Sequence, residues 1–332
     1  MSFRGTHTSR CVCDVWLSGP NSIHYFGSNC MFLPTVGQAN VATALESLSG
    51  ADSSLTVQTL SAEHEAEVLA FLAARPVQTV FISGFIHDNG LESSLNRGTF
   101  YGCRNAKGRL EGVALIGHFT LVEVRTESAL ELFARLAQDC PSAHMILGEQ
   151  ENVAAFWNYF AQAGRTQRRA CRELLFEQRT PTELLEPLIG LRQATPDDLP
   201  VILPVYAEMV CQESAVNPLE VDPTGFENRW RRRIDQGRVW VWIENGRLMF
   251  NADVMSETPD VIYLEGIYVD PEDRGRGLGV RCLSQLSRDL LQRAKSLCLL
   301  VNEQNQRARA FYEKAGYTLC GYYDTIFLHL KN

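Results

Sequence analysis

The chain has 332 residues, of which 45% are hydrophobic, so it can bury a large core, and its length favours two domains over one. Its formal net charge of -8 argues against nucleic-acid binding through bulk electrostatics, and no apolar run approaches the roughly 20 residues that a bilayer-spanning helix needs. The N-terminus lacks the continuous apolar core of a secretory signal, so we expect a cytoplasmic protein that binds neither nucleic acid nor membrane.

The ten cysteines are scattered and mostly lie in apolar surroundings, as in Leu297-Cys298-Leu299, which favours buried thiols over a disulfide framework. Cys11 and Cys13 are too close together for the usual zinc pair and have no matching second pair, so we expect no metal site. Residues 1–54 contain Gly, Ser and Asn throughout and show no sustained period. They are expected to form a poorly ordered extension.

Residues 55–185 form the first predicted domain, in which strand and helix patterns alternate. Ser61, followed by two acidic residues, begins a helix although it lacks a full capping box. The turn at 105–108 predicts a hairpin. The predicted strands are 55–60, 98–103, 110–116, 121–124 and 144–147, and the predicted helices are 61–72, 129–137 and 153–161.

Residues 190–330 repeat this order. Thr195 is an N-cap candidate before Pro196, and Pro204 is expected to kink the helix that follows. Early hairpins followed by strand-helix-strand units predict a mixed sheet flanked by helices, an α/β (α+β) fold. The predicted strands are 191–194, 239–243, 247–254, 261–269, 297–301, 318–322 and 325–328, and the predicted helices are 199–209, 226–234, 278–291 and 308–315.

The stretch 269–280 joins the apolar strand 261–269 to the amphipathic helix that follows it. Gly275, Gly277 and Gly279 remove Cβ atoms that would keep a ligand from the backbone, so successive amides can point at one anion. The N-terminus of the helix adds unpaired donors. The turn therefore predicts a phosphate site, although helix-packing turns also use glycine. It matches neither the triphosphate loop nor the dinucleotide loop, which would need a glycine at Cys282.

Two motifs carry a resemblance to a known family. Arg274-x-x-Gly277-x-Gly279 resembles the loop with which the GNAT superfamily of N-acetyltransferases holds the pyrophosphate of acetyl-coenzyme A. The segment from Asn305 to Tyr317 is similar to the superfamily's Asn-x-x-Ala-x-x-Phe-Tyr-x-x-x-Gly-Phe motif. The resemblance implies that the cofactor contacts Ile267, Tyr268, Val269 and Asn305 along its pantetheine arm and Arg274, Gly275, Arg276, Gly277, Leu278, Gly279 and Val280 at its pyrophosphate.

An internal repeat divides the roles of the two domains. Residues 159–164 align with residues 311–316, but Phe160 stands where the second copy has Tyr312, and no glycine lies between 121 and 129. The chain therefore resembles two-domain GNAT proteins, with a degenerate GNAT-like domain at 55–185 and a catalytic GNAT domain at 190–330.

The resemblance implies transfer of an acetyl group to a primary amine of a small molecule or protein, by direct attack in a ternary complex. Tyr312 fits the family's general acid, unless it is a core aromatic. Glu265 is the candidate base, directly or through water, unless it is a solvent-facing edge acid, and Asp253 is the second candidate. Histidine is disfavoured because the second domain holds only His329.

The acceptor is left open. The segment 212–222 is acidic and suits a cationic amine, whereas the arginines of 229–233 favour the opposite, unless they form a solvated helix face with Trp230 packed inward. A non-catalytic acetyl-coenzyme A sensor or interaction scaffold is the rival function. A phosphate-binding enzyme of another class is disfavoured because no metal-ligand cluster accompanies the loop. We expect a monomer or homodimer.

Overall fold

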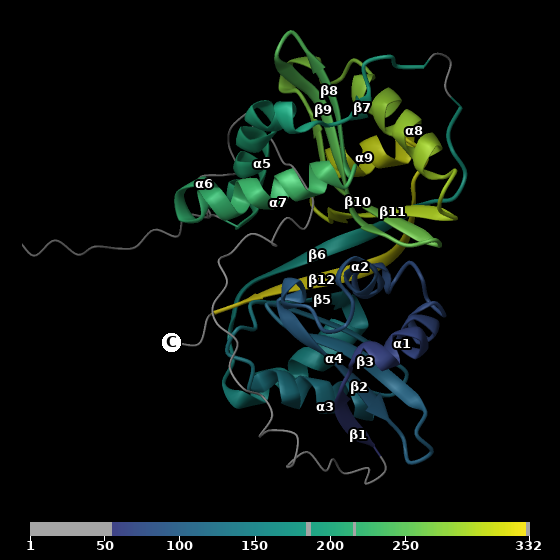
Figure 1. The fold of residues 1–332 in the computed structure, drawn as a ribbon, viewed down its shortest axis with the longest axis vertical. Coiled ribbons are helices and arrows are strands. Elements are labelled where there is room, and N and C mark those ends of the chain that lie inside the picture. The colour runs from purple at the N-terminus through teal and green to yellow at the C-terminus, as the bar shows by residue number, and fades with distance from the viewer. Residues whose placement is uncertain (1–54, 184–186, 215–216, 330–332) are drawn as a thin grey trace, which may run out of the picture.

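The computed structural model describes residues 55–183, 187–214 and 217–329, so the predicted N-terminal extension and the Cys11 and Cys13 pair lie outside the described residues. Within these ranges the chain forms one 12-stranded mixed sheet with helices on both faces (Figure 1). The strand order is β1-β2-β3-β4-β5-β12-β6-β11-β10-β9-β8-β7. The mixed sheet and flanking helices that the sequence predicted are confirmed.

The first half of the described chain contains strands β1 (Thr56–Thr59), β2 (Gly98–Arg104), β3 (Leu110–Gly117), β4 (Phe119–Val124), β5 (Met145–Glu149) and β6 (Gln167–Gln178) and helices α1 (Glu65–Leu72), α2 (Val80–Asn89), α3 (Glu127–Gln138) and α4 (Gln150–Phe160). The second half contains strands β7 (Arg192–Gln193), β8 (Val239–Glu244), β9 (Arg247–Glu257), β10 (Val261–Val269), β11 (Ser296–Asn302) and β12 (Thr318–Leu328) and helices α5 (Leu199–Ser214), α6 (Pro218–Val221), α7 (Pro223–Asp235), α8 (Leu278–Leu290) and α9 (Gln306–Lys314). The sequence patterns did not predict α2 or β6.

The two halves exchange strands at the centre of the sheet. β12, the last strand of the chain, lies antiparallel between β5 and β6 of the first half. β6 in turn pairs antiparallel with β11 of the second half. Figure 1 shows β6 and β12 running side by side across the middle of the molecule. Each half therefore completes the sheet of the other.

The prediction of two closing strands, 318–322 and 325–328, was wrong, because one strand spans Thr318–Leu328. Asp324 lies between the two predicted segments and remains inside the strand. Its partner in the antiparallel register is Arg172 on β6, whose Nε lies 2.8 Å from the Asp324 Oδ1. A cross-strand ion pair thus accommodates a residue that is otherwise depleted in strands.

Separate apolar clusters cover the faces of the sheet. In the first half, α3 and α4 bury one face and α1 and α2 the other. In the second half, α8 and α9 bury one face, while α5 and α7 bury the other around Trp230, which is 0% exposed as predicted. α2 extends over the second half as well: Phe81 packs on Tyr263 of β10 with ring centroids 4.4 Å apart. A Cβ at Gly84 would overlap Ser256 of β9, so this helix lies very close to the sheet.

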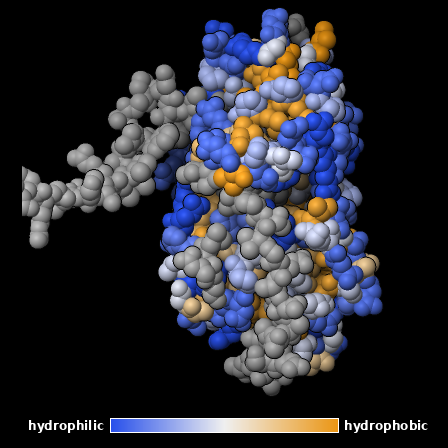
Figure 2. All heavy atoms as spheres, turned by 60° about the vertical axis from the view of Figure 1, so that its left-hand side comes forward, coloured by the Kyte–Doolittle hydropathy of each residue, from blue (hydrophilic) through white to orange (hydrophobic). Residues whose placement is uncertain are grey.

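The surface in Figure 2 is mostly hydrophilic, with small apolar patches. None of the helices within the described residues combines the length and apolarity needed to cross a bilayer. Cysteines that the structure describes are free thiols, and those at 103, 140, 282 and 298 are buried, as predicted from their apolar surroundings.

Candidate active site

Strands β10 and β11 separate along their length. Their parallel pairing covers only Val261–Tyr263 of β10 against Ser296–Cys298 of β11. Beyond that point β10 continues to pair with β9, whereas β11 continues to pair with β6. From Leu264 onward, the edge of β10 that faces β11 therefore has backbone groups outside any described strand ladder. The predicted pantetheine contacts, 267–269, lie on this separated part, and we call the space between the two strands the wedge.

A β-bulge marks the start of the wedge. The register against β9 shifts between Glu265 and Tyr268, and Gly266 between them has φ +62°. A Cβ on Gly266 would lie 2.8 Å from the ring of Tyr206, so the bulge and the close tyrosine both require glycine. The amide of Asn251 donates to the Gly266 carbonyl at 2.9 Å and to the Tyr206 hydroxyl. Sequence reasoning missed both side chains, and a glycine inside a strand was the available signal.

The predicted phosphate turn is open on its outer side. Gly275 and Gly277 have φ of +75° and +81°, and a Cβ on either would meet nothing within 4 Å. Gly277 is the N-cap of α8, where no side chain caps the helix and no acidic residue lies in the first turn. The first amides of α8, including those of Leu278 and Val280, are thus oriented as anion donors. The cradle fits a phosphate group.

Gly279 has a different role from the other two glycines. A Cβ at this position would point inward, 2.5 Å from Val269 Cγ2 and 3.0 Å from the ring of Phe311. Gly279 therefore lets α8 pack closely on the end of β10 and on α9. The alternative reading of the turn, helix packing, applies to this one glycine.

Arginines surround the turn. The Arg274 side chain donates from Nε and Nη2 to the Val269 carbonyl at 2.9 and 2.8 Å, and burial and the charge of Arg307 lower the pKa of Arg274. Arg276 is mainly exposed and lies 3.4 Å from Asp273. Three acidic side chains near the turn are paired with Arg247 of β9: Asp270 at 3.1 Å, Glu272 at 2.8 Å and Asp273 at 2.8 Å. These acids are therefore compensated and repel an incoming phosphate less.

The second predicted motif lies on α9. Asn305 is 6% exposed and caps the helix, since its Oδ1 accepts from the Ala308 amide at 3.0 Å. Tyr312 is 3% exposed and its ring packs against Phe176 of β6 with centroids 6.3 Å apart. Burial raises the pKa of the Tyr312 phenol, so it stays protonated, as a proton donor must.

The two candidate bases share one arginine. Glu265 and Asp253 are register partners on β10 and β9 and are 2% and 0% exposed. Arg233 of α7 lies between them, with Nη2 2.8 Å from the Asp253 Oδ2 and Nη1 3.8 Å from the Glu265 Oε1. Burial raises the pKa of both carboxyl groups, and the positive charge of Arg233 opposes this shift. Glu265 is thus no solvent-facing edge acid, and Arg233 does not belong to a solvated helix face.

The candidate acid and base lie on opposite faces of the sheet. Tyr312 belongs to the apolar cluster of α8 and α9, which also contains Ile267 of β10. Glu265 instead faces Arg233 of α7, on the side that α5, α7 and α2 cover. The wedge begins at the part of β10 that carries Glu265.

The first half has a similar separation of strands, but a side chain fills it. β4 and β5 pair only at Phe119–Thr120 and Met145–Ile146. Beyond this point Arg75 bridges them, with Nη1 3.2 Å from Glu123 on β4 and Nη2 2.6 Å from Glu149 on β5. The helix that follows β4 is capped by its own Thr126 side chain, which accepts from the Ala129 amide at 3.3 Å, and Glu127 lies in its first turn. These features disfavour an anion there.

Residues 252–325 match the family model described as FR47-like protein, which covers the wedge, the glycine turn and α9. No curated protein sequence is significantly similar to this chain. The structure is similar to an acetyltransferase of the GNAT family from Colwellia psychrerythraea, with 13% sequence identity and a TM-score of 0.51 over 82% of this chain and 100% of that one.

Two further solved structures are similar. A Drosophila protein has 14% identity and a TM-score of 0.57, covering 83% of this chain and 99% of its own. A tandem GNAT protein from the clavulanic acid biosynthesis pathway has 16% identity and a TM-score of 0.50, covering 84% of this chain and 100% of its own. This chain therefore has the fold of the GNAT acetyltransferase and of the tandem GNAT protein, and its residues 252–325 are similar to the FR47-like family.

Proposed function

We propose that the protein is an N-acetyltransferase that transfers the acetyl group of acetyl-coenzyme A to a primary amine in a ternary complex. One observation carries the proposal: β10 and β11 separate directly beside a glycine turn whose outer side is open and whose helix has no side-chain cap. A long ligand with an anionic end fits this combination. The first half lacks it, so one site per chain is expected.

The residues fit the proposed co-substrate. The amides of 274–280, in the turn and at the N-terminus of α8, would hold the pyrophosphate, and the edge of β10 at 267–269 that faces β11 would hold the pantetheine arm. Acetyl-coenzyme A, when bound, supplies an acetyl group activated as a thioester. Asn305, which caps α9 beside β11, keeps its predicted role as a contact of the arm.

Glu265 and Tyr312 take the two proton-transfer roles. Asp253 is the closer partner of Arg233, so its carboxylate is held in an ion pair, whereas Glu265 lies 3.8 Å from that arginine and remains the better proton acceptor. Glu265 removes the proton of the attacking amine as the C–N bond forms. Tyr312 gives its proton to the sulfur as the C–S bond breaks. The two side chains act from opposite faces through the wedge.

Steady-state turnover of acetyl-coenzyme A over a panel of primary amines tests the proposal. Glu265→Gln and Tyr312→Phe should each lower kcat at least about 100-fold, the range for a lost general base or acid, and leave the Kd for acetyl-coenzyme A unchanged by calorimetry. Tyr317→Phe is the matched control, since it also removes a buried tyrosine hydroxyl, one bonded to Ser287 at 2.9 Å. It should keep kcat near the wild-type value.

The pH profile separates a base from a structural carboxyl group. Burial raises the pKa of Glu265, so kcat/KM should rise with pH through this raised pKa as the carboxylate forms. Glu265→Gln should remove that limb of the profile. Full activity in both variants, with unchanged profiles, would refute the assignment of acid and base.

The burial of both carboxyl groups around Arg233 favours one alternative, a sensor that binds acetyl-coenzyme A without turnover. Saturable calorimetric binding with no acetylation of any amine would support the sensor. Absence of binding would refute both functions.

A further inference from the structure

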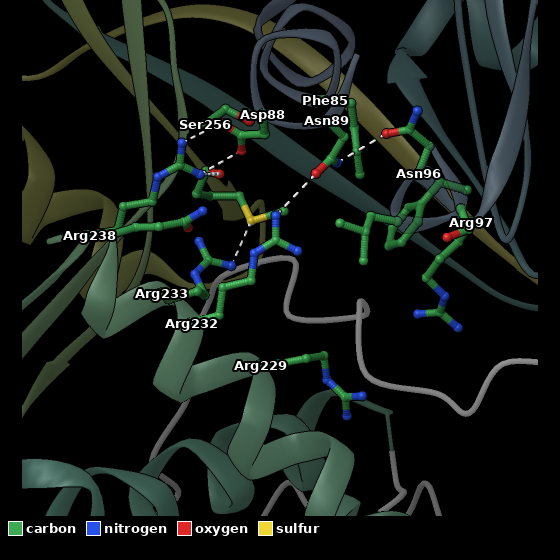
Figure 3. A pocket seen from close by; sticks show the side chains of 15 residues that line it. Phe85, Asp88, Asn89, Asn96, Arg97, Arg229, Arg232, Arg233, Arg238 and Ser256 are labelled. Atoms are coloured by element: carbon green, nitrogen blue, oxygen red, sulfur yellow. Dashed lines mark hydrogen bonds and ion pairs between the residues drawn. The ribbon is translucent and has the colours of Figure 1, made fainter. Parts of the chain in front are cut away.

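A cavity of about 420 Å³ lies between the two halves, on the same face of the sheet as Glu265. Its walls come from α2, the segment at residues 94–97 and Phe119 of β4 in the first half, and from α7, the segment at residues 236–238 and β9 in the second (Figure 3). Five arginines line it, together with one acidic residue, Asp88: the arginines are Arg97, Arg229, Arg232, Arg233 and Arg238. We call it the junction pocket.

The arginines of the junction pocket are unequally compensated. Arg238 pairs with Asp88, Arg233 pairs with Asp253, and Arg229 lies 3.2 Å from Asp222. Arg232 donates to the Asn89 side-chain oxygen at 3.4 Å, and no described acidic residue pairs with it. The positive charge of Arg232 therefore remains uncompensated by a described acidic residue, one helical turn from Arg229.

Arg97 faces this excess charge from the first half. It has φ +53°, and Figure 3 shows its side chain and that of Arg229 entering the pocket region from opposite walls. Burial and the charge of Arg229 lower the pKa of Arg97 to about 10. An anion between these guanidinium groups would relieve their repulsion, and the planar guanidinium fork suits a carboxylate or a phosphate.

The junction pocket is adjacent to the candidate base. Arg233 lines the pocket and its guanidinium also lies 3.8 Å from Glu265. The acidic segment 212–222 offers no comparable site for a cationic amine at its described end. Asp222 caps α7 by accepting from the Gly225 amide at 2.9 Å, and it also pairs with Arg229. The arginines, and not the acids, therefore form a cavity beside Glu265.

Resting on the proposed acetyltransferase function, we propose that the junction pocket binds an anionic group of the acceptor, a carboxylate or a phosphate, and so directs the amine of that acceptor to Glu265. The first half contributes Arg97 and α2 to this site. A half that has lost its own co-substrate cradle thereby selects the substrate of the other half.

Matched acceptors test the proposal. Glycine is compared with glycinamide, and O-phosphoethanolamine with ethanolamine, by kcat/KM at saturating acetyl-coenzyme A. Wild-type protein should favour the anionic member of at least one pair by about tenfold or more, which corresponds to one charge-assisted interaction. The pair that shows the preference identifies the anion as carboxylate or phosphate.

Three variants locate the selectivity. Arg232→Gln and Arg97→Gln should reduce the anionic-to-neutral ratio at least about fivefold through KM for the acceptor, with the Kd of acetyl-coenzyme A unchanged. Arg231→Gln is the matched control, because this substitution removes the same charge from the same helix. Arg231 itself pairs with Glu227 at 2.8 Å and does not line the pocket. It should keep the wild-type ratio.

Equal kcat/KM for the anionic and neutral members in wild-type protein would overturn the inference, as would an unchanged ratio in both Arg232→Gln and Arg97→Gln. If no amine is acetylated, the proposed function fails, and calorimetry then tests separately whether the junction pocket binds an anion. Saturable binding of glycine or O-phosphoethanolamine that Arg232→Gln weakens at least about tenfold would then support an anion site. Absence of such binding would refute it.

Discussion

Gly279→Ala should destabilise the fold through packing and not through backbone strain. The added Cβ would lie 2.5 Å from Val269 Cγ2 and 3.0 Å from Phe311, where ordinary contacts begin at about 3.4 Å. Overpacking of this kind destabilises by about 1–3 kcal/mol, and the better helix propensity of alanine offsets up to about 1 kcal/mol. We expect a net loss of about 1–2 kcal/mol in the free energy of unfolding.

Val269→Ala removes the atom that the new methyl meets. In this background only the 3.0 Å contact with Phe311 remains, so Gly279→Ala should become close to neutral, which is a coupling of about 1 kcal/mol or more in a double-mutant cycle. Gly277→Ala is the control: its Cβ meets nothing within 4 Å, but its φ of +81° should destabilise by about 1–2 kcal/mol in either background.

Urea unfolding followed by tryptophan fluorescence gives the four free energies of each cycle. The reasoning about Gly279 is refuted if its substitution destabilises the Val269→Ala protein as much as the wild type. It is equally refuted if Gly277→Ala shows the same rescue, because the two glycines would then not differ in role.

Three other changes test separate contacts. Arg75→Met leaves Glu123, which is 7% exposed, without its bridging partner and should lower the unfolding free energy by about 1–3 kcal/mol in urea, while acetyl-coenzyme A affinity stays unchanged. Hydrogen bonds from Arg192 hold the pKa of the Asp198 carboxyl group at about 2. The ionised carboxylate therefore adds to the free energy of unfolding above its unfolded-state pKa, and this stabilisation is lost as pH falls through about 2. Asp198→Asn should thus be less stable than wild type at pH 5 and equally stable near pH 2. Gly84→Val forces a side chain between α2 and β9 and should lower the melting temperature by several degrees, whereas an unchanged value would show that α2 can move away.

The sequence predicted the elements whose signals are local. The turn at Asn245 and Gly246, with φ of +52° and +75°, joins β8 and β9 as the hairpin pattern indicated. The strand, glycine turn and helix around Gly277 also formed as expected, because hydrophobic period and glycine placement act over a few residues.

Features that depend on the other half of the chain were not predictable in this way. α2 is apolar on most sides because it is buried between both halves, so it lacks the polar face of an isolated amphipathic helix. The partners of β6 are β11 and β12, each more than a hundred residues away, and no local signal specifies them. The sequence pattern does not separate Arg233 from the neighbouring arginines, and only the packing of α7 brings it to Asp253 and Glu265.

The exchange of strands explains how a half without a co-substrate cradle remains necessary to the proposed site. Phe176 of β6 packs on Tyr312, so the first half builds part of the environment of the candidate acid. α2 packs on Tyr263 next to the bulge, and Arg97 supplies one wall of the junction pocket. The first half needs no anion site of its own to make these contacts, and Arg75 bridges its separated strands instead. In the proposed arrangement the first half is therefore a structural and substrate-selecting part of one site, not a second site.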